Sequence, residues 1–214
     1  MKGANLQRAN LKDANLKDAD VQQADLSNAD LRRARLDGAQ LGSAILKGAL
    51  LPSSGIFTAN SGVSVSENGR LVTTSSTDWR GVLTEDWIDT AGMAYAEFVL
   101  EVVPDSCYCM FGVTSLEAVP SDGVCCGKAG SSMYYCHNSK AFPGERDWGA
   151  GAGRKQGDRV GLLVKQGSLY VYVNGRQLGL GPMVSGGLPT RVRFAADMAY
   201  SVKVRVMEEV WCPE

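Results

Sequence analysis

Residues 1–30 read MKGANLQRANLKDANLKDADVQQADLSNAD and repeat a five-residue pattern. Alanine recurs at every fifth position, and a Leu or Val follows each alanine two places later. The alanines are Ala4, Ala9, Ala14, Ala19, Ala24, Ala29, Ala34, Ala39, Ala44 and Ala49, and their partners are Leu6, Leu11, Leu16, Val21, Leu26, Leu31, Leu36, Leu41, Leu46 and Leu51. A repeat this regular is the strongest indication of the architecture of its segment, so it is interpreted first.

Neither of the standard periods explains this repeat. At about 100° per residue, five steps rotate a helix by about 500°, so successive alanines would spiral around it. On a flat strand, an odd spacing sends alternate alanines to opposite faces. The pattern fits a coil in which each five-residue unit is one short side and the chain then turns a corner. Alanine and leucine both point inward, and successive coils stack through backbone hydrogen bonds roughly 4.8 Å apart.

The stretch GANLQRANLKDANLKDADVQQADLSNADL (residues 3–31) resembles the pentapeptide-repeat family, whose signature is A-(D/N)-L-x-x. The resemblance extends over residues 3–51. It implies a right-handed quadrilateral β-helix with four repeats per turn, and therefore about two and a half coils in this chain.

The position after each alanine changes character along the coil. It reads Asn5, Asn10, Asn15, Asp20, Asp25, Asp30, Arg35, Gln40, Ile45 and Leu50. Because a solenoid end needs covering, we expect Ile45, Leu50 and Leu51 to pack against the part of the chain beyond the coil. The alternative is that the last repeats have drifted. By the same argument, residues 3–20 are expected to dock on another chain, pair with a second copy or continue from upstream sequence.

The segment LPSSG (residues 51–55) breaks the repeat and marks a boundary. We therefore predict a repeat segment at 1–51, a linker at 52–56 and a second domain at 57–214. Alternating runs separated by turn signals predict that this domain is an antiparallel β-sandwich. Its clearest hairpin is SLYVYVNGRQLG (168–179), in which an Asn-Gly pair provides the turn.

The same domain carries a second resemblance. AYAEFVLEV, MFGVTS, SMYYCHNSKAF, GDRVGLLVKQGSLYVYVNGRQLG and LPTRVRFAADMAYSVKVRV are similar to the successive blocks of a SPRY domain, over about 55–210. The resemblance implies a bent β-sandwich that binds proteins through loops at one edge and is not an enzyme. The predicted fold class is therefore all-β, a short right-handed quadrilateral β-helix followed by an antiparallel SPRY-type β-sandwich.

Composition excludes several classes of partner. The formal net charge of −1 provides no field for nucleic acid or for an anionic membrane. Apolar stretches are far shorter than the roughly 20 residues of a spanning helix, so no transmembrane segment is expected. No basic, apolar leader is visible before the repeats.

Cysteine clustering makes a metal site worth testing. Zinc needs about four soft ligands in a tetrahedron, and the candidates are Cys107, Cys109, Cys125, Cys126, Cys136 and His137. No pair among them has the Cys-x₂₋₄-Cys spacing of a structural zinc site. Buried thiols that act as small hydrophobic side chains are the default interpretation, and a disulfide stays open.

Other catalytic or cofactor motifs are weak. GAGAGRK (149–155) is glycine-rich but is not followed by the Ser or Thr of a phosphate loop, so it favours a flexible connection. His137 is the only histidine, and nucleophilic catalysis needs a base that a third group orients. We therefore expect no enzyme and no cofactor.

Aromatic and basic residues in apparent loops are better candidates for function. SSTDWRG (75–81), SMYYCHN (132–138) and GERDWG (144–149) contain the residue types that are enriched in binding hot spots. The candidate partner-binding residues are Trp79, Arg80, Tyr134, Tyr135, Arg146 and Trp148. The alternative is that Trp79 and one of the tyrosines belong to the sandwich core.

The leading hypothesis is a non-catalytic interaction or scaffold protein with a protein partner. Pairing of the two module types hints at a subunit of a plastid, photosynthetic assembly, and a cytoplasmic location is the alternative. A DNA-mimicking inhibitor would need a strongly acidic coil, whereas residues 1–51 carry eight Lys or Arg against six Asp. A zinc protein that uses the cysteine cluster is the third hypothesis.

Overall fold

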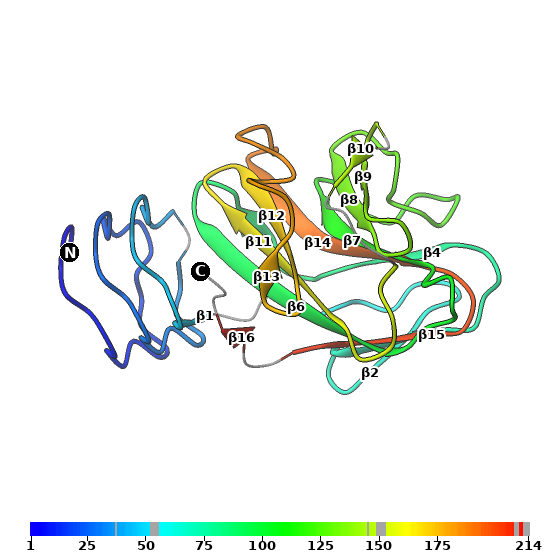
Figure 1. The fold of residues 1–214 in the computed structure, drawn as a ribbon, viewed down its shortest axis with the longest axis horizontal. Coiled ribbons are helices and arrows are strands. Elements are labelled where there is room, and N and C mark those ends of the chain that lie inside the picture. Colours follow the sequence, from blue (N-terminus) through cyan, green and yellow to red (C-terminus); the bar gives the residue numbers. More distant parts are fainter. Residues whose placement is uncertain (37, 52–55, 145, 149–152, 208–209, 212–214) are drawn as a thin grey trace.

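The structure is a computed structural model that describes residues 1–36, 38–51, 56–144, 146–148, 153–207 and 210–211. These residues form strands, bridges, turns and loops, and no helix occurs among them. The repeat coil lies at one end of the molecule and the β-sandwich occupies the rest (Figure 1). The predicted all-β class is confirmed, and no helix of the described part is long and apolar enough to cross a membrane.

The repeat segment folds as the predicted square coil. Parallel bridges join residues that are twenty positions apart, such as Asn5 with Asp25 and Asp25 with Ile45. Five residues therefore make one side and four sides make a turn. The Leu6 amide donates to the Asp25 carbonyl at 2.7 Å, and the Asp25 amide donates to the Ala4 carbonyl at 2.9 Å. Inside the coil, the alanines and leucines of the second turn are buried.

The position after each alanine has a structural role at the corners. The side-chain oxygens of Asn5, Asn10, Asn15, Asp20, Asp25 and Asp30 each accept a hydrogen bond from the backbone amide two residues later, at 3.0–3.1 Å. This bond stabilises a turn. The corner also places a left-handed residue three positions after the Asn or Asp, for example Arg8 at φ 58° and Asp13 at φ 60°.

One sheet of the sandwich has the strand order β10-β9-β8-β7-β14-β4, and β5 also pairs with β14. Within the described residues it has seven strands: β4 (Arg80–Leu83), β5 (Ile88–Asp89), β7 (Cys109–Thr114), β8 (Ser131–Tyr135), β9 (Lys140–Phe142), β10 (Arg146–Asp147) and β14 (Arg191–Met198). These strands pair antiparallel with their neighbours.

The second sheet has the order β13-β12-β11-β6-β15-β3-β2. Its seven strands in the described chain are β2 (Ser64–Ser66), β3 (Leu71–Thr74), β6 (Met93–Val102), β11 (Arg159–Lys165), β12 (Ser168–Val173), β13 (Arg176–Gln177) and β15 (Val202–Val206). Between the sheets, the Phe98 ring stacks on Phe111 with centroids 4.8 Å apart. The predicted Asn-Gly turn joins β12 to β13, with Asn174 at φ 50° and Gly175 at φ 76°.

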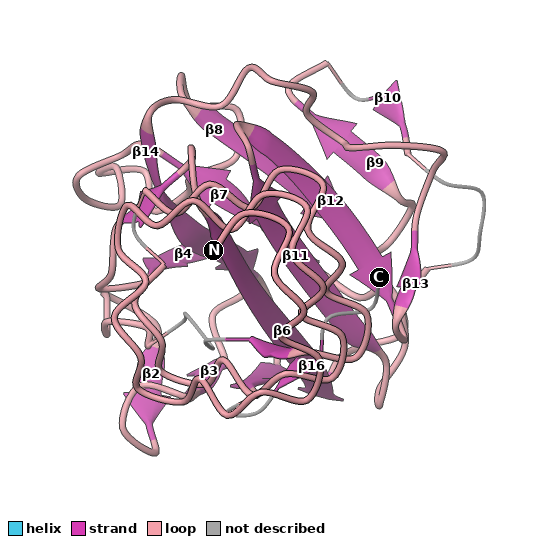
Figure 2. Cartoon of the chain, turned by 90° about the vertical axis from the view of Figure 1, so that its left-hand side faces the viewer, coloured by secondary structure: helices cyan, strands magenta, loops and turns pink. Residues whose placement is uncertain are grey.

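The outer face of the second sheet covers the end of the coil. Side chains of β6, β11 and β12 that point away from the sandwich core join the buried core of the coil, namely Met93, Tyr95, Leu163 and Tyr172. Seen from the coil, β6 and β11 lie directly behind it (Figure 2). The coil therefore shares its hydrophobic core with the outer face of this sheet, in a cluster separate from the core between the two sheets.

A short additional sheet also joins the two parts. Strand β1 (Leu50–Leu51) pairs antiparallel with β16 (Val210–Trp211), with Leu50 opposite Trp211. Leu51 is 1% exposed within the shared core, and Leu50 is half-buried. Ile45 differs from the expectation, because it occupies the outward bridge position above Asp25 and is 52% exposed. The linker residues 52–55 lie outside the described residues, and docking of residues 3–20 on another chain stays a prediction.

Candidate functional site

Five aromatic rings share one surface of the sandwich, and we call them the aromatic platform: Trp79, Tyr108, Tyr135, His137 and Tyr200. The Trp79 centroid lies 5.8 Å from Tyr135 and 6.1 Å from Tyr108. Tyr108 lies 4.5 Å from Tyr200 and is stacked at 6.4 Å on His137. Four segments that are distant in sequence therefore supply one continuous aromatic surface.

Backbone hydrogen bonds hold three of these segments together. The Tyr200 amide donates to the Ser76 carbonyl at 2.6 Å, which ties the β14–β15 loop to the β3–β4 loop. The Ala199 amide donates to the Tyr108 carbonyl at 3.0 Å. Because the rings stand on segments fixed in this way, the platform is formed before any partner arrives, which lowers the entropy cost of binding.

Neighbouring residues in these segments differ sharply in burial. Cys107, Cys109 and Cys136 are fully buried. Tyr108 lies between the first two in sequence, and Tyr135 and His137 flank the third. Tyr108 and Tyr135 are half-buried and His137 is exposed, whereas the three thiols have no exposed surface. The thiols therefore lie beneath the platform, and the rings form its surface.

Exposure and polarity make this surface suited to contact with a partner. His137 is exposed, Tyr200 is 43% exposed, and the remaining three rings are half-buried. Burial raises the pKa of Tyr135 to about 12, and the neighbouring Tyr108 adds to the shift. Its hydroxyl therefore stays protonated at neutral pH and can donate a hydrogen bond. The Arg80 guanidinium lies 3.3 Å from the Asp78 carboxylate, and the Arg80 side chain runs beside Gly62 and Gly123.

Several candidate residues from the sequence lie elsewhere. Tyr134 is 0% exposed, and its hydroxyl is 3.2 Å from the Ser139 hydroxyl, so it belongs to the core as the alternative held. Trp148 is half-buried against the sandwich core, where its ring lies beside Gly179. The side chain of Arg146 lies outside the described residues. Trp79 and Tyr135 are at the platform, and Arg80 donates to the Trp79 carbonyl at 3.1 Å.

Sequence reasoning misses Tyr108 and Tyr200 and treats His137 only as a possible metal ligand or base. The signal for Tyr108 is the triplet Cys107-Tyr108-Cys109, in which an amphipathic ring lies between two residues of a type that is usually buried. No comparable local signal identifies Tyr200, because its place depends on the path of the β14–β15 loop.

The cysteines do not assemble into a single zinc cluster. Cys107, Cys109 and Cys136 lie together. Cys125 and Cys126 lie in a different loop, whose backbone amides donate hydrogen bonds to the Asp197 carboxylate. His137 stacks on Tyr108 at the surface. Among the residues with described positions, no group of three or more His, Cys, Asp or Glu is arranged to hold a metal ion.

Comparisons with known proteins separate the two parts of the chain. Residues 1–33 and 9–51 match the family described as pentapeptide repeats, in eight copies. No curated protein matches the chain. Among solved structures, the SPRY domain of human HERC1 is 14% identical, with a TM-score of 0.57, and the match covers 71% of this chain and 93% of that one.

Two further structures agree with this match. A human SPRY domain is 15% identical with a TM-score of 0.52, covering 71% of this chain and 96% of that one. The TRIM65 PSpry domain is 12% identical with a TM-score of 0.53, covering 72% and 92%. The chain joins pentapeptide repeats to a SPRY-fold sandwich. At these identities the likeness establishes the fold of the sandwich and nothing finer.

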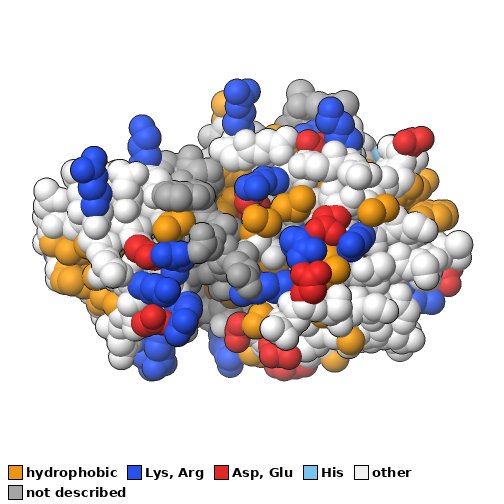
Figure 3. Space-filling view, turned by 90° about the horizontal axis from the view of Figure 1, so that it is seen from below, with side chains coloured by type: hydrophobic (Ala, Val, Ile, Leu, Met, Phe, Trp, Pro, Cys, Tyr) orange, Lys and Arg blue, Asp and Glu red, His pale blue; other side chains and the backbone are white. Residues whose placement is uncertain are grey.

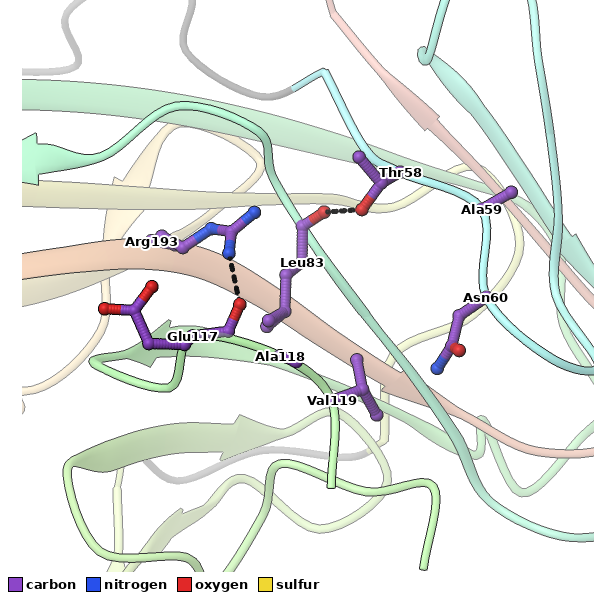
Figure 4. A pocket seen from close by; sticks show the side chains of 8 residues that line it. All are labelled: Thr58, Ala59, Asn60, Leu83, Glu117, Ala118, Val119 and Arg193. Carbon is purple, nitrogen blue, oxygen red and sulfur yellow. Dashed lines mark hydrogen bonds between the residues drawn. The ribbon is translucent and has the colours of Figure 1, made fainter. Parts of the chain in front are cut away.

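One pocket of the SPRY-fold sandwich lies between the segment 58–60, strand β4 and the loop 117–119. It has a volume of about 220 Å³ and is lined by Thr58, Ala59, Asn60, Leu83, Glu117, Ala118, Val119 and Arg193 (Figure 4). The Arg193 guanidinium donates to the Thr84 carbonyl at 2.5 Å and to the Glu117 carbonyl at 2.9 Å. Through these bonds, Arg193 links the segment after β4 to the loop at 117–119.

A second pocket, of about 340 Å³, lies where the pentapeptide-repeat coil meets the SPRY-fold sandwich. Its lining is Lys17, Asp18, Arg35, Gly38, Trp87, Asp89 and Arg191. The Arg191 and Arg193 guanidinium groups lie 5.0 and 5.3 Å from the centre of the Trp87 ring. Cations and carboxylates are mixed here, so the lining does not select one sign of charge.

Proposed function

We propose that this chain is a non-catalytic interaction protein that binds a protein partner through the aromatic platform. The observation that carries the proposal is the convergence of five rings from four segments on one accessible surface. Tyr and Trp are among the residue types enriched in binding hot spots, and this surface combines them. The SPRY fold supports the proposal, because SPRY domains typically bind proteins.

Surface charge supports a protein partner over nucleic acid. On the face shown in Figure 3, Lys and Arg side chains lie over the coil together with Asp side chains. Residues 1–51 have two more basic than acidic side chains. A DNA mimic needs a continuous acidic surface, and a nucleic-acid binder needs a strongly basic one. The coil has neither.

The experiment compares a platform variant with a matched surface variant. Tyr200 has a left-handed backbone at φ 62°, and asparagine tolerates that conformation, so Tyr200→Asn removes the ring without straining the loop. Leu180→Ser changes a fully exposed side chain outside the platform. Tagged chains are purified from the native source, companions are identified by mass spectrometry, and their affinities are then measured by calorimetry.

We expect Tyr200→Asn to lower the affinity for a stoichiometric companion at least about tenfold, as loss of a hot-spot side chain does. Leu180→Ser should bind it as the unaltered chain does. Equal affinity of both variants would refute the platform as the site. Recovery of the chain without any stoichiometric companion would refute the interaction function itself.

We further propose that the partner belongs to a plastid, photosynthetic assembly. The support is the pairing of a pentapeptide-repeat coil, a module common in cyanobacteria and plastids, with a mainly eukaryotic SPRY fold. Fractionation of the source cells tests it, and the chain should sediment with the plastid complexes. Recovery only in the cytosolic fraction would contradict this location and leave the interaction function standing.

A further inference from the structure

Three thiols lie directly beneath the platform. Cys107, Cys109 and Cys136 are each fully buried and belong to one hydrophobic cluster. Backbone bonds hold the same three residues together. The Cys109 amide donates to the Cys107 carbonyl at 2.7 Å, and the Cys136 amide donates to the Cys109 carbonyl at 2.9 Å. None of the five described cysteines is in a disulfide.

Cys107 differs from its two neighbours. Its backbone is left-handed at φ 40°, which is uncommon and strained for a residue other than glycine. Its pKa is lowered, because hydrogen bonds from Cys109 and Cys136 and the nearby Arg154 charge favour the thiolate over the opposing effect of burial. The pKa values of Cys109 and Cys136 are raised, chiefly by burial. One reactive sulfur therefore lies against two thiols that keep their protons.

We propose that Cys107 and Cys136 form a peroxide-sensitive modification site, and that the disulfide between them alters the aromatic platform above it. Only the second half, the effect on partner binding, rests on the function proposed above. Cys136 is the chosen partner because it directly follows strand β8 and its amide bonds the Cys109 carbonyl, which brings it to the same buried cluster as Cys107 from a different segment. Cys109 is separated from Cys107 by one residue, and a bridge between them would close a small strained ring.

The chemistry balances with hydrogen peroxide as the oxidant. The Cys107 thiolate attacks one peroxide oxygen, the O–O bond breaks, and a sulfenic acid and hydroxide form. The Cys136 sulfur then attacks the sulfenic sulfur, its proton leaves, and water departs as the S–S bond forms. Two thiols are oxidised by two electrons, and one peroxide is reduced to two waters.

Access to the buried sulfurs requires local opening. A hydrogen bond from the Cys107 amide to the Pro104 carbonyl, at 2.8 Å, closes the Cys107 turn. Peroxide is close to water in size, so a brief opening of residues 104–107 is enough to admit it. Local openings of loops cost much less free energy than global unfolding. The reaction is therefore expected to be slower than that of an exposed thiol and to reach completion with excess peroxide.

The coupling to the platform follows from adjacency in sequence. Tyr108 directly follows Cys107, and Tyr135 and His137 flank Cys136. Drawing the two sulfurs from a non-bonded separation to a covalent bond of about 2.05 Å moves one backbone relative to the other. That shift changes the spacing between Tyr108 and the rings of Tyr135 and His137.

The test begins with disulfide mapping. Cys126→Ser and Cys212→Ser are combined as a background, since Cys126 is half-buried and Cys212 lies outside the described residues. The folded chain is treated with hydrogen peroxide, alkylated in denaturant and digested for mass spectrometry. We expect a Cys107–Cys136 bridge, which is retained in Cys109→Ser and lost in Cys136→Ser.

A trapping reaction makes the result independent of how the variants fold. Dimedone added with the peroxide should label Cys107 in Cys136→Ser, where no resolving thiol remains. In the background chain it should label Cys107 less, because Cys136 competes. Free thiols at both positions after excess peroxide would overturn the proposal, as would a bridge from Cys107 to Cys109.

The second readout is the platform itself. Peroxide treatment should change the tryptophan fluorescence, dithiothreitol should reverse the change, and Trp79→Phe should abolish it. Reversal separates disulfide formation from methionine oxidation. Oxidised chain should also bind the companion at least about fivefold more weakly. A mapped disulfide with unchanged fluorescence would overturn the coupling, and absence of a companion would affect only the function proposed earlier.

Discussion

Asp197 shows how one side chain can place a whole loop. It stands on β14, is 0% exposed, and accepts hydrogen bonds from the Cys125 amide at 3.0 Å and the Cys126 amide at 2.7 Å. Burial raises the pKa of its carboxyl group, although these amide bonds oppose the rise. The nearby carboxylate, after burial itself, raises the pKa of Cys125, so that thiol is expected to stay inert to peroxide.

The raised pKa of Asp197 predicts the direction in which the free energy of unfolding changes with pH. The folded state holds this proton more tightly than the unfolded chain, whose carboxyl has the ordinary pKa of 3.8. The free energy of unfolding therefore falls as pH rises from the unfolded pKa through the folded one. Asp197→Asn cannot ionise and should lack this fall. Urea titrations from about pH 4 to about pH 8 compare the two chains, and parallel profiles would contradict the assignment.

Removing the Asp197 side chain should lower the free energy of unfolding more than replacing its carboxyl group with an amide does. Asp197→Ala leaves the buried amides of Cys125 and Cys126 without their acceptor, so we expect the free energy of unfolding to drop by about 2–3 kcal/mol. Asp122→Ala is the matched control, since that carboxylate serves the same loop from an exposed position. A similar loss from both variants would show that burial of Asp197 is not the cause.

Among the elements, the sides of the coil have the same backbone structure, but early and late repeats differ in one hydrogen bond at the corner. The Asp25 carboxylate accepts a hydrogen bond from the Ser27 amide at 3.0 Å. Ile45 occupies the equivalent position one turn later, and its hydrocarbon side chain offers the Lys47 amide no acceptor. The last turn therefore lacks a bond that its predecessors have.

Supplying that bond should stabilise the coil. Ile45→Asn introduces the acceptor at an exposed position, so we expect the free energy of unfolding to rise by about 0.5–1 kcal/mol in urea denaturation. The matched change is Asn10→Ala, which removes the equivalent bond to Lys12 and should cost a similar amount. Destabilisation by Ile45→Asn would mean that this side chain packs against another surface, as the sequence alone indicated.

The elements also show what the sequence can and cannot predict. The Ala and Leu registers define the coil because a five-residue side buries both of them. The strands of the sandwich follow from alternation, yet alternation does not say which of Tyr134 and Tyr135 faces the core. That choice depends on pairing with β7, where Tyr134 lies opposite Phe111 and Tyr135 opposite Met110. The platform depends on loop paths as well, so only part of it is predictable.

For the whole molecule, we expect the coil and the sandwich to unfold as one cooperative unit, because they bury one cluster of side chains between them. Leu51 lies in the same buried cluster as Tyr95, Leu163 and Tyr172. The Tyr95 and Tyr172 rings meet edge to face with centroids 6.2 Å apart. Gly92 lets the two backbones approach, since a Cβ there would lie 3.0 Å from the Leu36 carbonyl oxygen.

A single substitution in this core should therefore destabilise both parts together. Leu51→Ala is expected to lower the free energy of unfolding by about 2–4 kcal/mol, because it leaves a cavity in a packed core. Circular dichroism and tryptophan fluorescence should report the same single transition. Val102→Ala, at a 42% exposed position of β6, is the control and should change little. Two separate transitions in the Leu51 variant would contradict a shared core.

The pairing of β1 with β16 has a consequence for the order of folding. Leu50 lies opposite Trp211, so this pair joins two residues that are separated by most of the chain. Contacts so distant in sequence lose much chain entropy when they form alone, and they are reached late unless intervening structure brings them together. Local corner turns and hairpins should therefore appear first, and the sandwich next. The last side of the coil gains its β16 neighbour only when the rest of the chain has already been assembled.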